Sequence, residues 1–189
     1  MAIITVAGFD PSLRNWGYCV GNYCTEAEGL VIKDIGVICP NVPKGKQIRQ
    51  NSKDLVSAQA LYEKAFALAM GVQALFVEVP HGSQSSRATV SYAVCVGVLG
   101  AMRASGRPFY ELTANEVKLA TGLSKTASKQ EMIDWATSKY PDAEWPTYNK
   151  NGKTLITSAK AEHIADSIAT IHAGLQLQEF RSLIAMTTH

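Results

Sequence analysis

Four ionisable residues at widely separated positions are of the types that bind divalent cations: Asp10, Glu78, His163 and Asp166. Asp10 and Glu78 each follow a short apolar stretch rich in β-branched residues, whereas His163 and Asp166 are three residues apart. Residues at that spacing share one face of a helix. Clustered carboxylates repel one another unless cations neutralise them, and hard divalent ions prefer oxygen ligands. If the four side chains converge, they can hold two metal ions roughly 4 Å apart, an arrangement that hydrolyses phosphodiesters.

Each of these residues also has an ordinary structural interpretation when it is taken alone. A strand-end aspartate usually serves a turn, and a strand-end glutamate is usually solvated. His163 could be a hydrogen-bonded core residue, and Asp166 could pair with Lys160. The neighbouring Glu162 should point about 100° away around a helix, which favours His163 as the ligand. Only the joint placement of the four residues favours a metal site.

Basic residues are concentrated in two segments, although the net charge of the 189-residue chain is only +2. The first segment holds no acidic residue, and the second has only Glu111 and Glu116 within it. Either segment alone could be a solvated surface; beside an acidic metal site, both are expected to bind phosphates. The first segment contains Lys44, Lys46, Arg49 and Lys53, and the second contains Arg103, Arg107, Lys118, Lys125 and Lys129.

The composition is that of one globular domain with a single core. Hydrophobic residues make up 47% of the chain and charged residues 18%, which argues against disorder. The four cysteines show no CxxC spacing, which is typical of small apolar residues in a reducing compartment. No apolar run is long enough to span a membrane, and no signal peptide precedes the first strand, so we expect a cytoplasmic protein.

Strands must position the first two carboxylates. The apolar residues 3–7 predict a central strand, and Pro11 should end its pairing just after Asp10. The next two strands should complete an antiparallel meander, with turns around Gly21-Asn22 and over residues 26–29. A fourth strand comes after a helix and should lie parallel to the first, which would place Glu78 beside Asp10. The five predicted strands are 3–7, 16–20, 30–38, 74–79 and 108–112.

Helices should cover this sheet. The residues Leu55, Ala58, Tyr62, Ala65 and Ala69 repeat at helical spacing and predict a helix over 52–70, with Ser52 as its cap. A second helix, from Ser83 or Ser85 to about residue 104, is apolar all round and should be buried in the core, or else form a dimer face. Thr113 and Ser128 open two further helices with capping boxes. A polar loop should span 141–156, and a last helix with an apolar stripe should begin at Thr157 or Ser158.

With these elements in place, the chain resembles the RuvC-type Holliday junction resolvases of the ribonuclease H-like superfamily. Residues 8–18, which read GFDPSLRNWGY, are similar to that family's opening G-I-D-P-G-x-R-x-x-G-Y. Val77-Glu78 resembles the second acidic strand end, and Lys118 with Lys129, eleven residues later, resembles a two-lysine segment. Residues 161–169 resemble the last helix with its paired ligands. The similarity in order and spacing covers most of residues 1–175.

The resemblance implies an α/β ribonuclease H-like fold, with a five-stranded mixed sheet whose first three strands are antiparallel. It implies one nuclease domain over residues 1–175 and a helical extension or tail over 176–189. It also implies a homodimer that nicks four-way DNA symmetrically, leaving 5′-phosphate and 3′-hydroxyl ends. Mg²⁺ or Mn²⁺ would be bound by Asp10, Glu78, His163 and Asp166, and Lys118 and Lys129 would act at the scissile phosphate. The expected DNA contacts are Lys44, Lys46, Arg49, Lys53, His81, Arg87 and Lys125.

The departures from the family pattern are informative. His163 stands where many members carry aspartate, and because imidazole suits Mn²⁺ better than Mg²⁺, we expect higher activity with Mn²⁺. His81 lies where the family often places an aromatic side chain that wedges the junction centre. The divergent tail and the long loop over 141–156 indicate a bacteriophage-encoded or otherwise distant branch.

Three alternatives stay open from the sequence. The first is a related nuclease that acts on flaps, forks or RNA–DNA hybrids. The second is a junction-binding protein with weak cleavage, which the intact acidic set disfavours. The third is an actin-like ATPase. Gly152-Lys153-Thr154 lacks the first glycine of a phosphate loop, however, so the sequence offers little support for it.

Overall fold

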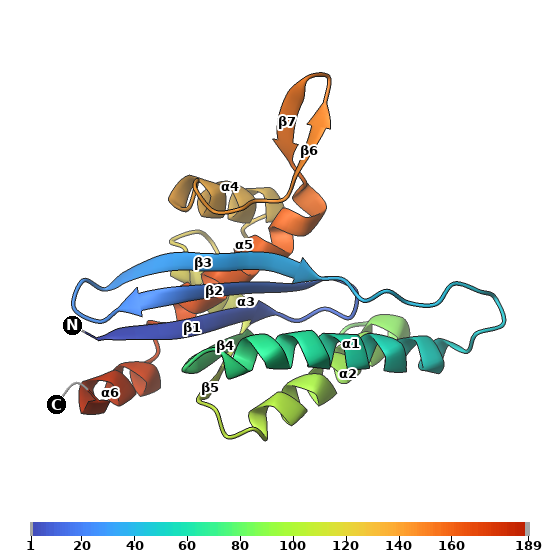
Figure 1. Cartoon of the computed structure of the whole chain (residues 1–189), viewed down its shortest axis with the longest axis horizontal. Helices are drawn as coiled ribbons and strands as arrows, with labels where there is room; N and C mark the ends of the chain where they lie inside the picture. The colour runs from blue at the N-terminus through green and yellow to red at the C-terminus, as the bar shows by residue number, and fades with distance from the viewer. Residues whose placement is uncertain (1, 188–189) are drawn as a thin grey trace.

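The computed structural model, which describes residues 2–187, contains a mixed five-stranded sheet between two layers of helices (Figure 1). The strand order is β3-β2-β1-β4-β5, which places β1 at the centre. The first three strands are antiparallel, and β4 and β5 run parallel to β1, as predicted. The strands are β1 (Ile3–Asp10), β2 (Trp16–Cys24), β3 (Gly29–Ile38), β4 (Ala74–Glu78) and β5 (Phe109–Leu112).

The turn predicted near Gly21 is wrong, because β2 continues through it to Cys24. Asn22 lies opposite Thr5, whose hydroxyl donates a hydrogen bond to the Asn22 side chain. Gly21 marks an irregularity in the pairing of β2 with β3, and the space left by its missing side chain is filled by Leu30. The connection to β3 lies at residues 25–28, close to the second predicted turn over 26–29.

Two helices, α1 (Gln50–Met70) and α2 (Ser86–Arg103), cover one face of the sheet. Helix α1 begins before Ser52, and its buried face includes Leu61 rather than Leu55, which is 71% exposed. The expectation that α2 is buried on all sides is also wrong. One side of α2 packs in the core, whereas Val90 and Val96 on it are 44% and 45% exposed. Because α2 is apolar on every side, the side that faces away from the core is an exposed apolar surface.

The other face is covered by α3 (Ala114–Ala120), α4 (Lys129–Lys139), α5 (Ser158–Gly174) and α6 (Gln178–Thr187). Both predicted capping boxes are present, with Thr113 and Ser128 each accepting a backbone hydrogen bond at the start of its helix. Helix α5 is the most buried of these helices and lies against β1 and β2. In α6, Phe180 packs edge-on against Phe76 of β4, which ties the last helix to the core.

The polar loop predicted over residues 141–156 is instead largely a β-hairpin, formed by β6 (Thr147–Lys150) and β7 (Lys153–Ile156). Asn151 and Gly152 connect the strands with positive φ angles of 51° and 73°. This backbone is typical of a two-residue type I′ turn, for which Asn-Gly is the preferred sequence. Figure 1 shows the hairpin standing away from the body of the molecule, next to the start of α5.

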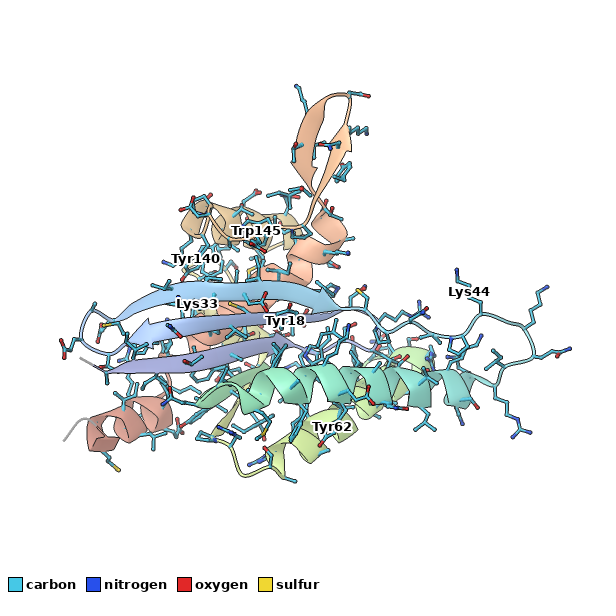
Figure 2. All side chains as sticks on the ribbon, viewed as in Figure 1. Tyr18, Lys33, Lys44, Tyr62, Tyr140 and Trp145 are labelled. Carbon is cyan, nitrogen blue, oxygen red and sulfur yellow. The ribbon has the colours of Figure 1, made fainter. Side chains whose placement is uncertain are left out.

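A second excursion is the loop between β3 and α1, which extends beyond the end of the sheet where β1 terminates (Figure 1). This loop contains Lys44, whose side chain lies on its outer part (Figure 2). All four cysteines are free thiols, as expected. Within residues 2–187, no helix has the length and apolar character needed to cross a membrane.

Candidate active site

The central sheet brings Asp10 and Glu78 to one edge. Asp10 is the last residue of β1, and Glu78 is the last residue of β4, the parallel neighbour of β1. In that pairing Phe9 lies opposite Val77, so the two carboxylates that follow them lie side by side. Pro11 has no amide hydrogen and stands just after β1, so that the chain leaves the sheet at this point.

Two glycines allow α5 to approach the sheet at the same edge. A Cβ atom on Gly17, the residue paired with Asp10, would lie 2.1 Å from the backbone oxygen of His163. A Cβ atom on Gly8 would lie 2.2 Å from the backbone oxygen of Ser167. Any larger residue at either position would push α5 away. The contact through Gly17 sets the backbone of His163 directly above Asp10.

The four side chains line one cleft of about 370 Å³. Asp10 and Glu78 come from the sheet, and His163 and Asp166 come from the same face of α5. The cleft is also lined by Pro11, Ser12, Pro80, His81, Gly82, Tyr92, Ala114, Lys129 and Glu162. The structure thus gathers all four residues that the sequence singled out, although they are spread over 157 positions from Asp10 to Asp166.

A short hydrogen bond joins two of these side chains. Nδ1 of His163 lies 2.6 Å from a carboxylate oxygen of Asp10. An ionised carboxylate can only accept, so Nδ1 carries the hydrogen and Nε2 is the nitrogen that remains available. Burial lowers the pKa of His163, but the hydrogen bond that it donates to Asp10 and the charges of Asp10, Glu162 and Asp166 outweigh burial and raise that pKa.

Glu162 does not point away from the site, contrary to expectation. One of its carboxylate oxygens lies 3.5 Å from Nε2 of His163. The other oxygen forms an ion pair with the Lys129 ammonium at 2.9 Å. The 100° offset places the Glu162 backbone to one side, but the length of the side chain lets its carboxylate turn back to the cleft. A fourth acidic residue therefore lies at the rim.

The electrostatics of the cleft indicate negative charge that the protein itself does not fully balance. Burial, followed by the charge of Asp10, raises the pKa of Glu78 to about 7, against a smaller opposing effect from Lys118. Burial also raises the pKa of Asp166 well above its usual range, with the charges of Asp10 and Glu78 adding to the effect. Such raised values are expected where several carboxylates share a partly desolvated site.

Of the two lysines predicted to assist catalysis, Lys129 lines this cleft, whereas Lys118 does not line it but lies near two of its acidic residues. The Lys118 ammonium donates a hydrogen bond of 2.9 Å to the backbone oxygen of Ala127 and is close enough to lower the pKa values of Glu78 and Asp166. Lys129 lines the cleft and pairs with Glu162. Each lysine is thus held by a neighbour while its charge faces the acidic residues.

The donor set fits hard divalent cations. Three carboxylates and one imidazole converge, and the raised pKa values of Glu78 and Asp166 indicate that added positive charge would be stabilising there. Within residues 2–187, no three His, Cys, Asp or Glu side chains are already spaced as ligands around one point. His163 would bind a metal through Nε2, since its Nδ1 is hydrogen-bonded to Asp10.

A larger basic cleft of about 890 Å³ adjoins this site through residues 11–14. Lys44, Lys46 and Lys53 line it, as do Arg87 and Arg14. Arg87 binds Asp54 through two hydrogen bonds of 2.5 and 2.6 Å, so part of its charge is neutralised within the protein. The sequence analysis missed Arg14 as a site residue, although it belongs to the opening motif.

The remaining predicted DNA contacts lie on exposed surfaces. Arg49 is exposed directly before α1, and Lys125 is exposed in the connection between α3 and α4. His81 is exposed as well and lines the acidic cleft. Tyr92 of α2 also lines that cleft and was missed, because it sits in an apolar helix with no motif to mark it.

Comparison with known proteins identifies the fold. No family model and no curated protein matches the sequence. Among solved structures, the chain is similar to Thermus thermophilus RuvC in complex with a Holliday junction substrate, with a TM-score of 0.63 and 17% identity. A second Thermus thermophilus RuvC structure gives a TM-score of 0.61 and 18% identity. In both cases 90% of this chain and 92% of the other chain are covered. The fold is ribonuclease H-like, and the predicted resemblance holds at the level of the fold.

Proposed function

We propose that this protein is a metal-dependent, structure-selective endonuclease that resolves four-way DNA junctions by paired symmetric nicks. The observation that carries the proposal is the convergence of Asp10, Glu78, His163 and Asp166 in one cleft with uncompensated negative charge. The fold likeness to a protein solved with a Holliday junction supports the choice of substrate. The nicks would leave 5′-phosphate and 3′-hydroxyl ends.

The four residues would hold Mg²⁺ or Mn²⁺, which when bound would activate the attacking water and stabilise the leaving oxygen. Lys118 and Lys129 would bind the scissile phosphate, since Lys129 lines the acidic cleft and the charge of Lys118 acts on Glu78 and Asp166. Release of Lys129 from Glu162 would free its charge for this role. His81, exposed at the rim, would stack against bases at the junction centre.

The basic cleft would bind one DNA arm beside the scissile strand. Its lysines and arginines contact phosphates, so selectivity would come from the shape of branched DNA more than from base edges. Lys125, which is exposed in the connection between α3 and α4, would contact the same backbone further along. Arg87 would both anchor Asp54 and present its remaining donors to DNA.

Symmetric cutting requires two active sites, so we infer a homodimer. The exposed apolar face of α2, which includes Val90 and Val96, is the natural contact between two copies. In this proposal residues 1–175 form the nuclease domain and residues 176–189 a C-terminal helical extension or tail, of which residues 188 and 189 lie outside the described part of the chain. The protein would act in the cytoplasm of a bacterial or phage-infected cell, in DNA recombination and repair.

The test uses end-labelled four-way junction, fork and linear duplex, each incubated with the purified protein and Mg²⁺, Mn²⁺ or chelator. We expect symmetric nicks in the junction with either metal and none with chelator. Asp10→Asn should abolish cutting and keep junction binding, because it removes a charge without removing volume. Normal cutting by Asp10→Asn would overturn the site, and preferential cutting of the fork would favour a flap or fork nuclease.

A further inference from the structure

The β6–β7 hairpin has two chemically different faces. In its register Tyr148 pairs with Leu155 and Lys150 pairs with Lys153. Residues two apart on a strand, and residues paired across strands, point to the same side. All four of these side chains therefore share one face, with the lysines at the tip and the apolar pair nearer the base. The other face carries Thr147, Asn149 and Thr154, with Ile156 packed against the core at its base, and on it Thr154 donates a hydrogen bond of 3.1 Å to Asn149.

The face that carries Lys150 and Lys153 is suited to binding an anion. Lys150 and Lys153 lie directly opposite each other, and like charges in that position destabilise a strand pair. Residues 145–161 contain three lysines and no acidic residue, so the hairpin sequence itself offers no balancing carboxylate. Tyr148 and Leu155 are 46% and 40% exposed. A two-stranded hairpin is marginally stable alone, so this arrangement gains from an external partner.

The hairpin is attached directly to the helix that carries the candidate ligands. The Thr157 amide donates a hydrogen bond of 2.8 Å to the Pro146 backbone oxygen and closes its base, and α5 begins at the next residue. From the start of α5 to His163 the helix rises about 8 Å, and a four-residue strand spans about 13 Å. The hairpin tip therefore lies within about 25 Å of the cleft, which is roughly seven base pairs of duplex.

We propose that the β6–β7 hairpin is a DNA-binding arm. It contacts the backbone of the duplex that flanks the scissile phosphate, up to about seven base pairs from the cleft. Lys150 and Lys153 bind phosphates on either side of the turn, which relieves their mutual repulsion. Tyr148 packs its ring against a sugar or an unstacked base. The inference rests on the proposed function and extends it, since the hairpin fixes the register of one arm relative to the active site.

A duplex fits this face better than a protein partner does. The apolar part consists of only Tyr148 and Leu155, far less than the area that stable protein–protein interfaces bury. The cationic part lies at the tip, where it can reach a phosphate backbone without close surface complementarity. The neighbouring Lys160 at the start of α5 is also exposed and continues the basic surface toward the body.

The test compares wild type with Lys150→Ala/Lys153→Ala in a fluorescence anisotropy assay on a four-way junction in chelator. We expect at least a ten-fold loss of affinity at 0.1 M salt, and a salt slope reduced by about 2, because each lost phosphate contact removes about 0.9. Lys150→Arg/Lys153→Arg should retain wild-type binding. The variant should fold normally, because the substitution removes a repulsive pair. The matched control is Lys33→Ala/Lys64→Ala, two exposed lysines on β3 and α1, which should leave affinity and slope unchanged.

Shortening the junction arms separates this contact from others. With arms of about 20 base pairs the wild type should bind more tightly than the variant, whereas arms of about three base pairs end before the hairpin tip and should remove the difference. Unchanged affinity and slope in the variant, while wild type binds and cuts the junction, would overturn the hairpin inference alone. Failure of wild type to bind any DNA would overturn the proposed function and the inference together.

Discussion

At the scale of single residues, burial and neighbouring negative charges in the acidic cleft oppose the ionisation of Glu78 and Asp166. Glu78 and Asp166 are largely buried and lie near Asp10, so each would gain from a proton or a metal ion. A site built in this way is less stable without its ligand, which is common where charge is arranged for function rather than for folding. This property gives the account a consequence that can be measured without any DNA.

We predict that ionisation of Glu78 lowers the stability of the metal-free protein as pH rises. Its folded pKa of about 7 lies above the unfolded value near 4.5, so the folded state binds the extra proton between these values. The stabilisation is complete below about pH 4.5 and is lost as pH rises through 7. The raised pKa values of Asp166 and His163 act in the same direction.

The measurement is urea unfolding of wild type and Glu78→Gln at pH 5 and pH 8. The free energy of unfolding of wild type relative to the variant should fall by on the order of 2–3 kcal/mol between these pH values. Burial lowers the pKa of His172 to about 4, and its opposite effect below pH 6.5 cancels because both proteins contain it. Added Mn²⁺ should restore wild type more at pH 8 than at pH 5. A pH-independent difference would contradict the prediction.

His163 should set the metal preference. Imidazole suits Mn²⁺ better than Mg²⁺, so wild type should cut faster with Mn²⁺, and His163→Asp should shift the rate ratio toward Mg²⁺. Because the pKa of His163 is raised, protonation should begin to reduce the rate at a pH above the usual value near 6.5. Junction cleavage rates over a pH series with each metal test this, and equal rates in both metals at every pH would refute it.

At the scale of elements, the site depends on how closely α5 lies on the sheet. Gly8 and Gly17 leave no side chain between β1, β2 and this helix, so the backbone positions of His163 and Ser167 are fixed by contact. The sequence pattern predicted the apolar stripe of α5 but gave no reason for these glycines, because close approach between distant segments is visible only in three dimensions.

We expect Gly17→Ala to destabilise the protein by roughly 3 kcal/mol, because the new methyl group meets backbone that cannot yield without moving α5. Junction cleavage should fall with it, since His163 shifts relative to Asp10. Thermal unfolding and cleavage rates measure the two effects. Gly29→Ala is the matched control, since its added Cβ meets only one atom, at 3.9 Å, and it should change neither quantity. A fully active, fully stable Gly17→Ala would show that α5 does not need this contact.

Local sequence signals predicted some elements and misled on others for physical reasons. The capping boxes at Thr113 and Ser128 are local, and both helices begin where predicted. The hairpin turn also had a local signal, Asn151-Gly152, but the flanking strands are polar and lack the alternation that usually marks them. Helix α2 has no distinct polar face, so the side that packs against the core could not be predicted from its sequence.

At the scale of the whole molecule, the strand order explains how distant residues meet. Placing β4 parallel to β1 aligns the ends that carry Glu78 and Asp10, and this followed from a helix separating the two strands. The sequence could therefore predict the convergence of the acids, but only some of the side chains that surround them, such as His81 and Lys129. Arg14, Tyr92 and Glu162 reach the clefts through loop paths and rotamers that no spacing rule describes.

The outer face of α2 should control assembly. Val96→Asp places a charge in the proposed contact between two copies and should convert a dimer to a monomer in sedimentation velocity at micromolar concentration. The nicks should then become unpaired rather than coordinated. Leu119→Asp on α3, which is 58% exposed and lies on the opposite side of the sheet, should leave the dimer intact. A Val96→Asp protein that remains dimeric would place the subunit contact elsewhere.

The most direct measurement of the central claim is anomalous X-ray diffraction from crystals of the protein soaked in Mn²⁺. The account predicts anomalous peaks in the acidic cleft within ligand distance of Asp10, Glu78 and Asp166, and their loss in Asp10→Asn crystals. Manganese bound only outside this cleft, in crystals of a protein that cuts junctions in the same buffer, would contradict it.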